Sequence, residues 1–287
     1  MAAESRPSPR PGEPDDAALL QRAAFGDLPS DPADGFFQPD CWLRRISGQP
    51  VAILGGGRAL LLEIAHPVVA AGVAEHSNFR RDPFGRLQRT LGAMRAITFE
   101  DRASGFAAVR AIERAHAVVH GTFDRPVGRH AAGSAYSAAD PDAKRWVWAT
   151  LVDTAAAVYR RFVGDLSAPA LEAYYADYCA IARLLGVPAQ QVPPSWEAFE
   201  AWFSSTLSGD TLHVDDRALE IAGAVLHGPL PEQDAKAVRL FTTALLPDRL
   251  RRDFGLDWSE ARQARFRALE VSVRALRGGV DAEPESR

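Results

Sequence analysis

Apolar residues recur every third or fourth position along four long segments, residues 86–99, 106–121, 143–164 and 168–186. This spacing places the apolar side chains on one face of an α-helix and the polar side chains on the other. Runs in which apolar and polar residues alternate, as they do in a half-buried strand, are nearly absent. The pattern therefore predicts an all-α protein, a single globular multi-helix bundle of roughly nine to eleven helices.

Residues that commonly begin or end helices occur next to these segments. Pro141, in an acidic stretch, precedes the third segment, and Ser195 precedes a further helical pattern. Both are typical of helix N-termini. Gly121, Gly164 and Gly186 follow apolar stretches and are predicted to end helices, because glycine adopts the backbone conformations that terminate a helix.

The domain organisation follows from two polar ends and an even composition between them. Residues 1–30 are rich in proline and polar side chains, and no apolar segment follows their arginines, so they are predicted to be a disordered leader without a secretion signal. Residues 31–278 are predicted to form one all-helical domain, and residues 279–287 a flexible tail. The absence of a secretion signal leads us to expect a cytoplasmic protein.

The longest apolar run, residues 51–76, is interrupted by Arg58, Glu63 and His66. The pieces are shorter than the roughly 20 apolar residues that a transmembrane helix needs. We therefore expect the run to be buried core, with no transmembrane segment. The net charge of -4 and the lack of Lys/Arg runs interleaved with aromatics argue against nucleic acid as a partner.

Two short motifs suggest chemistry that their neighbouring residues do not support. Glycines 55–57 lack both the third glycine of a dinucleotide fingerprint and the Lys-Ser/Thr of a phosphate loop, so a helix start or a close helix contact is expected there. His116 and His120 have the spacing of a zinc-hydrolase helix, but Ala117 occupies the position of the required glutamate. The sequence thus argues against a zinc hydrolase.

A Glu-x-x-His pattern occurs twice, as Glu63/His66 and Glu113/His116. Ferritin-like di-iron proteins use two such pairs, because the i, i+3 spacing puts a carboxylate and an imidazole on one helix face. Pro67 disfavours an α conformation at His66 and argues against the first pair. A haem site needs only one axial imidazole and an apolar slot, which periodicity alone does not reveal.

Four segments together resemble a known family: residues 60–90, 116–121, 136–153 and 174–188. In this order and spacing they are similar to the catalytic domain shared by bacterial rubber oxygenase (latex-clearing protein) and the oxygenase of fungal mycophenolic acid biosynthesis. The resemblance implies a haem-b-dependent oxygenase with an all-α core around a haem-sized apolar pocket. It also implies dioxygen as co-substrate and a small hydrophobic substrate, an alkene of the isoprenoid type.

The family motif H-x-x-V-x-G matches His116, Val119 and Gly121. In the family this segment provides the proximal haem ligand, so the resemblance implies that His116 binds the iron. His120, which would lie one helical turn further along, is the alternative ligand.

The family motif R-x-x-x-T matches Arg86 and Thr90, and the i, i+4 spacing places both on one helix face. The resemblance implies that Arg86 contacts a haem propionate or bound oxygen and that Thr90 adds a polar contact beside the haem. Arg89 is the alternative to Arg86.

Glu75 is the closest match to the carboxylate that acts as a candidate base in rubber-cleaving members, although its spacing to Arg86 differs from theirs. Trp148 stands where many relatives have a histidine, and an indole there would narrow or dry the cavity. Two other functions remain open: a ferritin-like di-iron carboxylate protein, and a non-catalytic helical protein that binds a lipid or a partner protein.

Overall fold

The computed structural model describes residues 35–80, 82–228 and 231–280. In this part of the chain, twelve α-helices and one two-stranded hairpin form the regular structure, which confirms the all-α prediction. Two of the helices, α2 (Trp42–Ser47) and α12 (Asp248–Asp253), have only six residues each. Such short helices show no clear periodicity, which explains why the apolar pattern predicts fewer helices than the structure contains.

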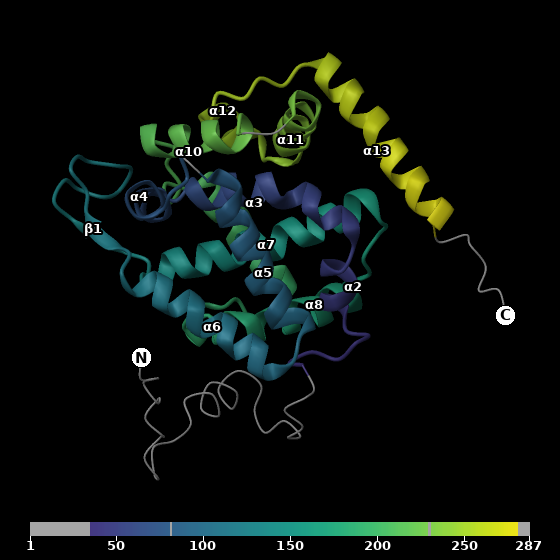
Figure 1. Cartoon of the computed structure of the whole chain (residues 1–287), viewed down its shortest axis with the longest axis horizontal. Helices are drawn as coiled ribbons and strands as arrows, with labels where there is room; N and C mark the ends of the chain where they lie inside the picture. The colour runs from purple at the N-terminus through teal and green to yellow at the C-terminus, as the bar shows by residue number, and fades with distance from the viewer. Residues whose placement is uncertain (1–34, 81, 229–230, 281–287) are drawn as a thin grey trace, which may run out of the picture.

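The remaining elements are longer helices, two 3-10 helices and the hairpin (Figure 1). In chain order they are η1 (Pro50–Gly55), α3 (Gly56–Ile64), α4 (Pro67–His76), α5 (Pro83–Phe99), α6 (Arg102–Ala117), β1 (His120–Thr122), β2 (Ala135–Ser137), α7 (Pro141–Phe162), α8 (Ala168–Leu184), η2 (Ala189–Gln191), α9 (Trp196–Ser208), α10 (Asp216–Leu226), α11 (Glu232–Leu245) and α13 (Glu260–Val280). The predicted leader lies outside the described residues, as does residue 281 onward of the predicted tail.

Helix α3 lies at the centre of the bundle and packs against α4, α7, α10 and α11. Its apolar side chains are buried on all sides, with Leu61, Leu62 and Ile64 at 0% exposure. Within the described residues, no single helix is long and apolar enough to span a membrane. One pair, Pro50–Ile64 with Pro67–His76, meets that test of length and composition together, but it is bent by 103°.

The bend follows from the sequence at His66 and Pro67. His66 is the N-cap of α4, with an extended backbone (φ −85°, ψ 122°), because the proline ring disfavours an α conformation in the preceding residue. Glu63 belongs to α3, so Glu63 and His66 do not occupy i, i+3 positions of one helix. The effect expected of Pro67 is thus confirmed.

The predicted helix over residues 106–121 ends earlier, at Ala117. Residues 120–122 instead form β1, which pairs antiparallel with β2, Gly121 lying opposite Tyr136. The β-branched Val118 and Val119 favour this change, because they lose side-chain freedom in a helix. His120 therefore does not continue the helix face of His116, contrary to the expectation for the alternative ligand.

Glycines 55–57 serve helix packing, as expected. Gly56 begins α3. A Cβ on Gly55 would lie 2.6 Å from Thr154 Cγ2, and one on Gly57 would overlap the hydroxyl of Thr242. These glycines let α7 and α11 approach the central helix closely.

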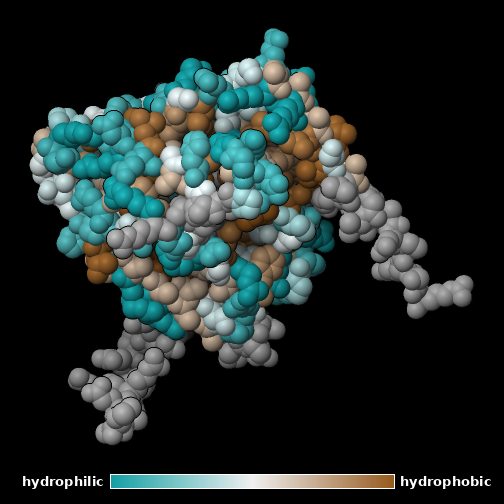
Figure 2. Space-filling view, turned by 45° about the horizontal axis from the view of Figure 1, so that its top comes forward, coloured by the Kyte–Doolittle hydropathy of each residue, from teal (hydrophilic) through white to brown (hydrophobic). Residues whose placement is uncertain are grey.

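Figure 2 shows hydrophilic and hydrophobic residues intermixed over one face, with hydrophobic ones gathered near the start of the grey C-terminal trace. The large hydrophobic side chains that are exposed lie on several different elements: Ile53, Leu91, Phe99, Val118, Leu219 and Val271. Scattered residues of this kind are normal on a protein surface.

Candidate active site

Helices α4, α5, α6 and α7 enclose a cavity of about 750 Å³. Its walls are mainly apolar, and the side chains that α6 contributes are mostly small. Ala108, Ala111 and Ala115 follow one another at helical spacing on the wall formed by α6, next to His116. Because alanine extends only one carbon from the backbone, this stripe leaves the space between the helices open.

Helix α5 contributes a second wall of small residues. Gly92 and Ala93 line the cavity, and a Cβ placed on Gly92 would meet no atom within 4 Å. Gly72 lines it from α4. The cavity thus results from small residues on three helices that face one another, a feature that emerges only when the helices are assembled.

Eight polar or charged side chains interrupt the apolar lining: Glu63, His76, Ser77, Asn78, Arg89, Thr90, His116 and Lys144. Ligand cavities typically combine a mostly apolar wall with a few polar groups of this kind, which fix the orientation of the bound molecule. Two of the eight are imidazoles, and they come from different helices, α4 and α6.

His116 lies in the last turn of α6, half-buried at the cavity wall. The other two residues of its motif have packing roles. Val119 packs against Gly72, where a Cβ would lie only 2.9 Å from the valine Cγ1. A side chain on Gly121 would lie 2.6 Å from the hydroxyl of Tyr136. The motif therefore combines a cavity-lining histidine with two closely packed residues, Val119 between α6 and β1 and Gly121 in β1.

The R-x-x-x-T motif lies on α5, with Arg86 in its first turn and Thr90 one turn later. Thr90 is half-buried and lines the cavity. The side chain of Arg86 lies outside the described residues. Arg89 lines the cavity rim with a side chain 67% exposed, and its guanidinium lies 3.7 Å from the carboxylate of Asp82.

Glu75 points away from the cavity lining. Val69, Gly72, Val73 and His76 form the face of α4 that lines it, and Glu75 occupies a neighbouring position on the helix surface. The carboxylate instead accepts a hydrogen bond from Tyr136 at 2.5 Å.

Among the described residues, the carboxylate that lines the cavity is that of Glu63, which the sequence suggested only as part of a di-iron pair. Glu63 is only 3% exposed and comes from α3. Its position inside the long apolar run is the sequence signal that singles it out, because an ionisable residue is rarely buried without a specific role or partner.

Trp148 lies on α7 and is 1% exposed, with part of its surface lining the cavity. Its indole nitrogen donates a hydrogen bond to the backbone carbonyl of Tyr178 at 2.8 Å. The ring also packs edge-on against Phe199, with 5.7 Å between the ring centroids. The indole is thus held by the core and supplies an apolar wall where many relatives have a histidine.

The second cofactor alternative, a di-iron centre, lacks a ligand cluster in the described part of the chain. No group of three or more His, Cys, Asp or Glu residues is arranged there to hold a metal ion. Glu113 is exposed, and His120 is exposed on β1 and is not among the cavity-lining residues. Of the residues considered as iron ligands, His116 and Glu63 line the cavity, whereas Glu113, His66 and His120 are not among its lining residues.

Beneath the helix break, His66 is a buried histidine with 1% exposure, and neither of its ring nitrogens has a hydrogen-bond partner among the described residues. Burial lowers the pKa of His66 to about 4, an effect that the nearby Arg129 supports and the nearby Asp140 opposes. The side chain is therefore neutral at pH 7.

This histidine predicts a pH-dependent stability. In the unfolded chain its pKa is near 6.5, so between pH 6.5 and pH 4 the unfolded state binds more protons than the folded state. The free energy of unfolding should be unaffected by this group above pH 6.5 and fall by about 3 kcal/mol as the pH drops to 4. Denaturant unfolding at several pH values measures this free energy. Between pH 6.5 and pH 4, the free energy of unfolding should depend less steeply on pH in His66→Gln than in the wild type. An unchanged slope in that variant would contradict the assignment.

Comparison with known proteins places this helical cavity in a family. Residues 44–275 match the family model described as "ER-bound oxygenase mpaB/B'/Rubber oxygenase, catalytic domain". The chain belongs to this family and is an oxygenase of the rubber oxygenase/MpaB type, hence an oxidoreductase.

Two curated relatives, both described as uncharacterised proteins, come from Mycobacterium bovis and Mycobacterium tuberculosis. Each is 31% identical over 225 residues, which cover 73% of this chain and 82% of the relative. No solved structure matches the chain.

Proposed function

We propose that the protein is a haem-b-dependent oxygenase that uses dioxygen to oxidise a small hydrophobic alkene of the isoprenoid type. The observation that carries the proposal is the position of His116 on the wall of the apolar cavity, beside a stripe of alanines. An imidazole facing an open, apolar space is what an axial haem ligand requires.

The other residues of the cavity fit the same cofactor. Arg89 and Lys144 bring positive charge to the lining, where the two propionates of haem b need cationic partners. Two cavity walls carry small side chains: Gly92 and Ala93 on α5, and the alanines of α6. These side chains project little into the cavity, which leaves the space that a flat macrocycle requires. Haem b, when bound, supplies the iron that activates dioxygen.

The chain itself contributes exclusion of water and a few fixed polar groups. Trp148 and the apolar residues of α4 and α7 favour a hydrophobic substrate and disfavour bulk water. Thr90 lines the cavity and would supply a hydroxyl donor there, and the resemblance implies a polar contact from Arg86 as well. Of the two candidates for a carboxylate that accepts a substrate proton, Glu63 lines the cavity, whereas Glu75, the residue that the resemblance implies, is bonded to Tyr136 and does not line it. A cytoplasmic location belongs to the same proposal.

Reconstitution with haem tests the proposal directly. The purified protein is titrated with hemin and its absorption spectrum recorded before and after reduction by dithionite. We expect a saturable Soret band at one haem per chain that shifts on reduction, because His116 would serve as the axial ligand of a single haem in the cavity. A protein that binds no haem would refute the proposal. About two irons per chain without porphyrin would favour the di-iron alternative.

A further inference from the structure

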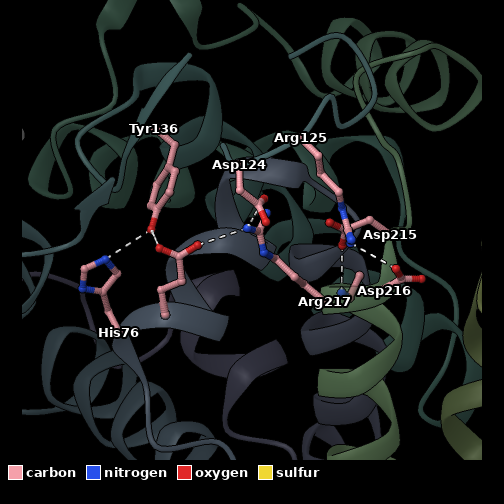
Figure 3. A network of polar contacts seen from close by, with 9 residues as sticks. His76, Asp124, Arg125, Tyr136, Asp215, Asp216 and Arg217 are labelled. Carbon is pink, nitrogen blue, oxygen red and sulfur yellow. Dashed lines mark hydrogen bonds and ion pairs between the residues drawn. The ribbon is translucent and has the colours of Figure 1, made fainter. Parts of the chain in front are cut away.

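A second histidine of the cavity, His76, is hydrogen-bonded to Tyr136, and neither of these two residues has a part in the function above. His76 is the last residue of α4 and lines the cavity. Tyr136 reaches it from β2, with the tyrosine hydroxyl 3.3 Å from the Nε2 atom (Figure 3). The same hydroxyl lies 2.5 Å from Oε2 of Glu75.

The charge on Glu75 decides where the phenol proton lies. Arg217 of α10 lies 3.3 Å from this carboxylate and 2.7 Å from that of Asp124, so Glu75 is ion-paired with a guanidinium. A carboxylate accepts hydrogen bonds and does not donate them. The 2.5 Å contact is typical of a hydroxyl bonded to a charged oxygen, so Tyr136 donates its single proton to Glu75.

Since the Tyr136 hydroxyl donates its only proton to Glu75, its oxygen can only accept a hydrogen bond from His76. The hydrogen bond then requires a proton on Nε2 of His76. In a neutral imidazole only one of the two ring nitrogens carries a proton, so Nδ1 keeps its lone pair. Among the described residues, no other hydrogen bond to the His76 ring competes with this arrangement.

We propose that Tyr136 and Glu75 hold His76 in the Nε2–H tautomer, so that Nδ1 of His76 serves as a proton acceptor at the cavity wall. When a proton arrives, a new N–H bond forms from the Nδ1 lone pair, and the proton's former partner keeps the bonding electrons. The positive charge of the imidazolium is then offset by the carboxylate of Glu75, which the hydroxyl of Tyr136 joins to His76. Tyr136 and Glu75 are positioning residues in this arrangement.

The hairpin is built to hold the phenol at this place. Tyr136 is 3% exposed and lies directly opposite Gly121, whose missing side chain leaves room for the hydroxyl. Burial, together with the hydrogen bond to Glu75, raises the pKa of Tyr136, so the phenol stays protonated at neutral pH. This explains the glycine of the H-x-x-V-x-G motif: a side chain there would displace the tyrosine that orients His76.

Several elements that pack on α4 or line the cavity carry charged or titratable side chains. They are Glu63 of α3, Arg89 of α5, His116 of α6, Lys144 of α7, and Arg217 and Glu220 of α10, the last of these paired with Arg80 at 2.5 Å. Arg217 contacts Glu75, and the carboxylate of Glu220 is neutralised by Arg80. Glu75, through Tyr136, is thus the acidic group that bears most directly on the ring.

The tautomer can be measured in protein without cofactor. The chain is labelled with 15N at histidine, and long-range 1H–15N correlation spectra distinguish a protonated from an unprotonated ring nitrogen. The signals of His76 are assigned among the seven histidines by their loss in His76→Gln. We expect neutral His76 to carry its proton on Nε2 in the wild type and to become a mixture of both tautomers in Tyr136→Phe. The matched control Tyr159→Phe, which removes a tyrosine hydroxyl from α7, should leave the His76 signals unchanged.

A proton on Nδ1 in the wild type, or an unchanged tautomer in Tyr136→Phe, would overturn the inference. Gly121→Ala is an independent variant that should produce the same mixture by displacing the phenol, and thermal melts establish that each variant is folded. Tautomer mixing in both variants supports the arrangement.

The catalytic role of His76 rests on the proposed oxygenase function and is tested in haem-loaded protein. His76→Gln should keep the Soret band but lower kcat at least tenfold with little change in KM, and Tyr136→Phe should shift the pH profile of kcat. An unchanged kcat in His76→Gln would overturn the role as proton acceptor. Failure of the wild type to bind haem would refute the proposed function alone, because the tautomer is measured without haem.

Discussion

Replacement of His116 by alanine is expected to abolish the Soret band of the haem-loaded protein. The imidazole of His116 lies at the cavity wall, and alanine offers the iron no donor atom. Outer-shell partners of metal ligands already change affinity by about 10- to 100-fold, so loss of the ligand itself should weaken haem binding by more than about 100-fold. Hemin titration followed by absorbance measures this change.

His120→Ala is the matched control, since His120 is an exposed histidine on β1 only four residues away. It should bind haem as the wild type does. Equal haem spectra in His116→Ala and in the wild type would show that another group holds the iron. His76 would then be the first candidate, because it is the other imidazole in the cavity.

Replacement of Trp148 by alanine is expected to destabilise the fold by about 3–5 kcal/mol, the range found when large aromatic core residues are truncated. The indole is 1% exposed and fills the space between α7, α8 and α9, where it contacts Tyr175 and Phe199. Removal of the indole also removes the N–H group that donates a hydrogen bond to the carbonyl of Tyr178. Denaturant unfolding measures the change in free energy, and enlargement of the adjacent cavity should accompany it.

Trp148→Phe separates the two contributions, because it keeps an aromatic ring but removes the N–H group. Loss of the indole hydrogen bond should cost about 0.5–1.5 kcal/mol, less than the alanine variant, because the Tyr178 carbonyl lies inside α8 and keeps its helical partner. If both variants unfolded within about 0.5 kcal/mol of the wild type, the indole would not support the core as described.

The outcome at particular residues shows how far the sequence could predict the site. The apolar periodicity correctly placed α7 and α8, because long helices with one buried face repeat that pattern over many turns. The end of α6 was misplaced by four residues, since the pairing of residues 120–122 with residues 135–137 is a contact between distant segments. As a result, the sequence predicted His120 to be helical, whereas it lies on β1.

The two glutamates show the same limit at the level of single side chains. Glu75 and His76 are neighbours in sequence, but only His76 faces the cavity, because consecutive helix residues point about 100° apart. Glu63 reaches the cavity from α3, whereas His116 reaches it from α6. A local pattern does not identify which of two carboxylates faces a cavity that separate helices enclose.

What the sequence by itself determined is the helical class, the family and the break at His66–Pro67, since apolar spacing, ordered motifs and proline sterics are properties of local sequence. Only the tertiary structure decided that small residues of three helices meet to leave a cavity, that Gly121 makes room for Tyr136, and that Tyr136 joins His76 to Glu75. Volume and hydrogen bonding depend on side chains from distant segments, and these come together only when the helices pack.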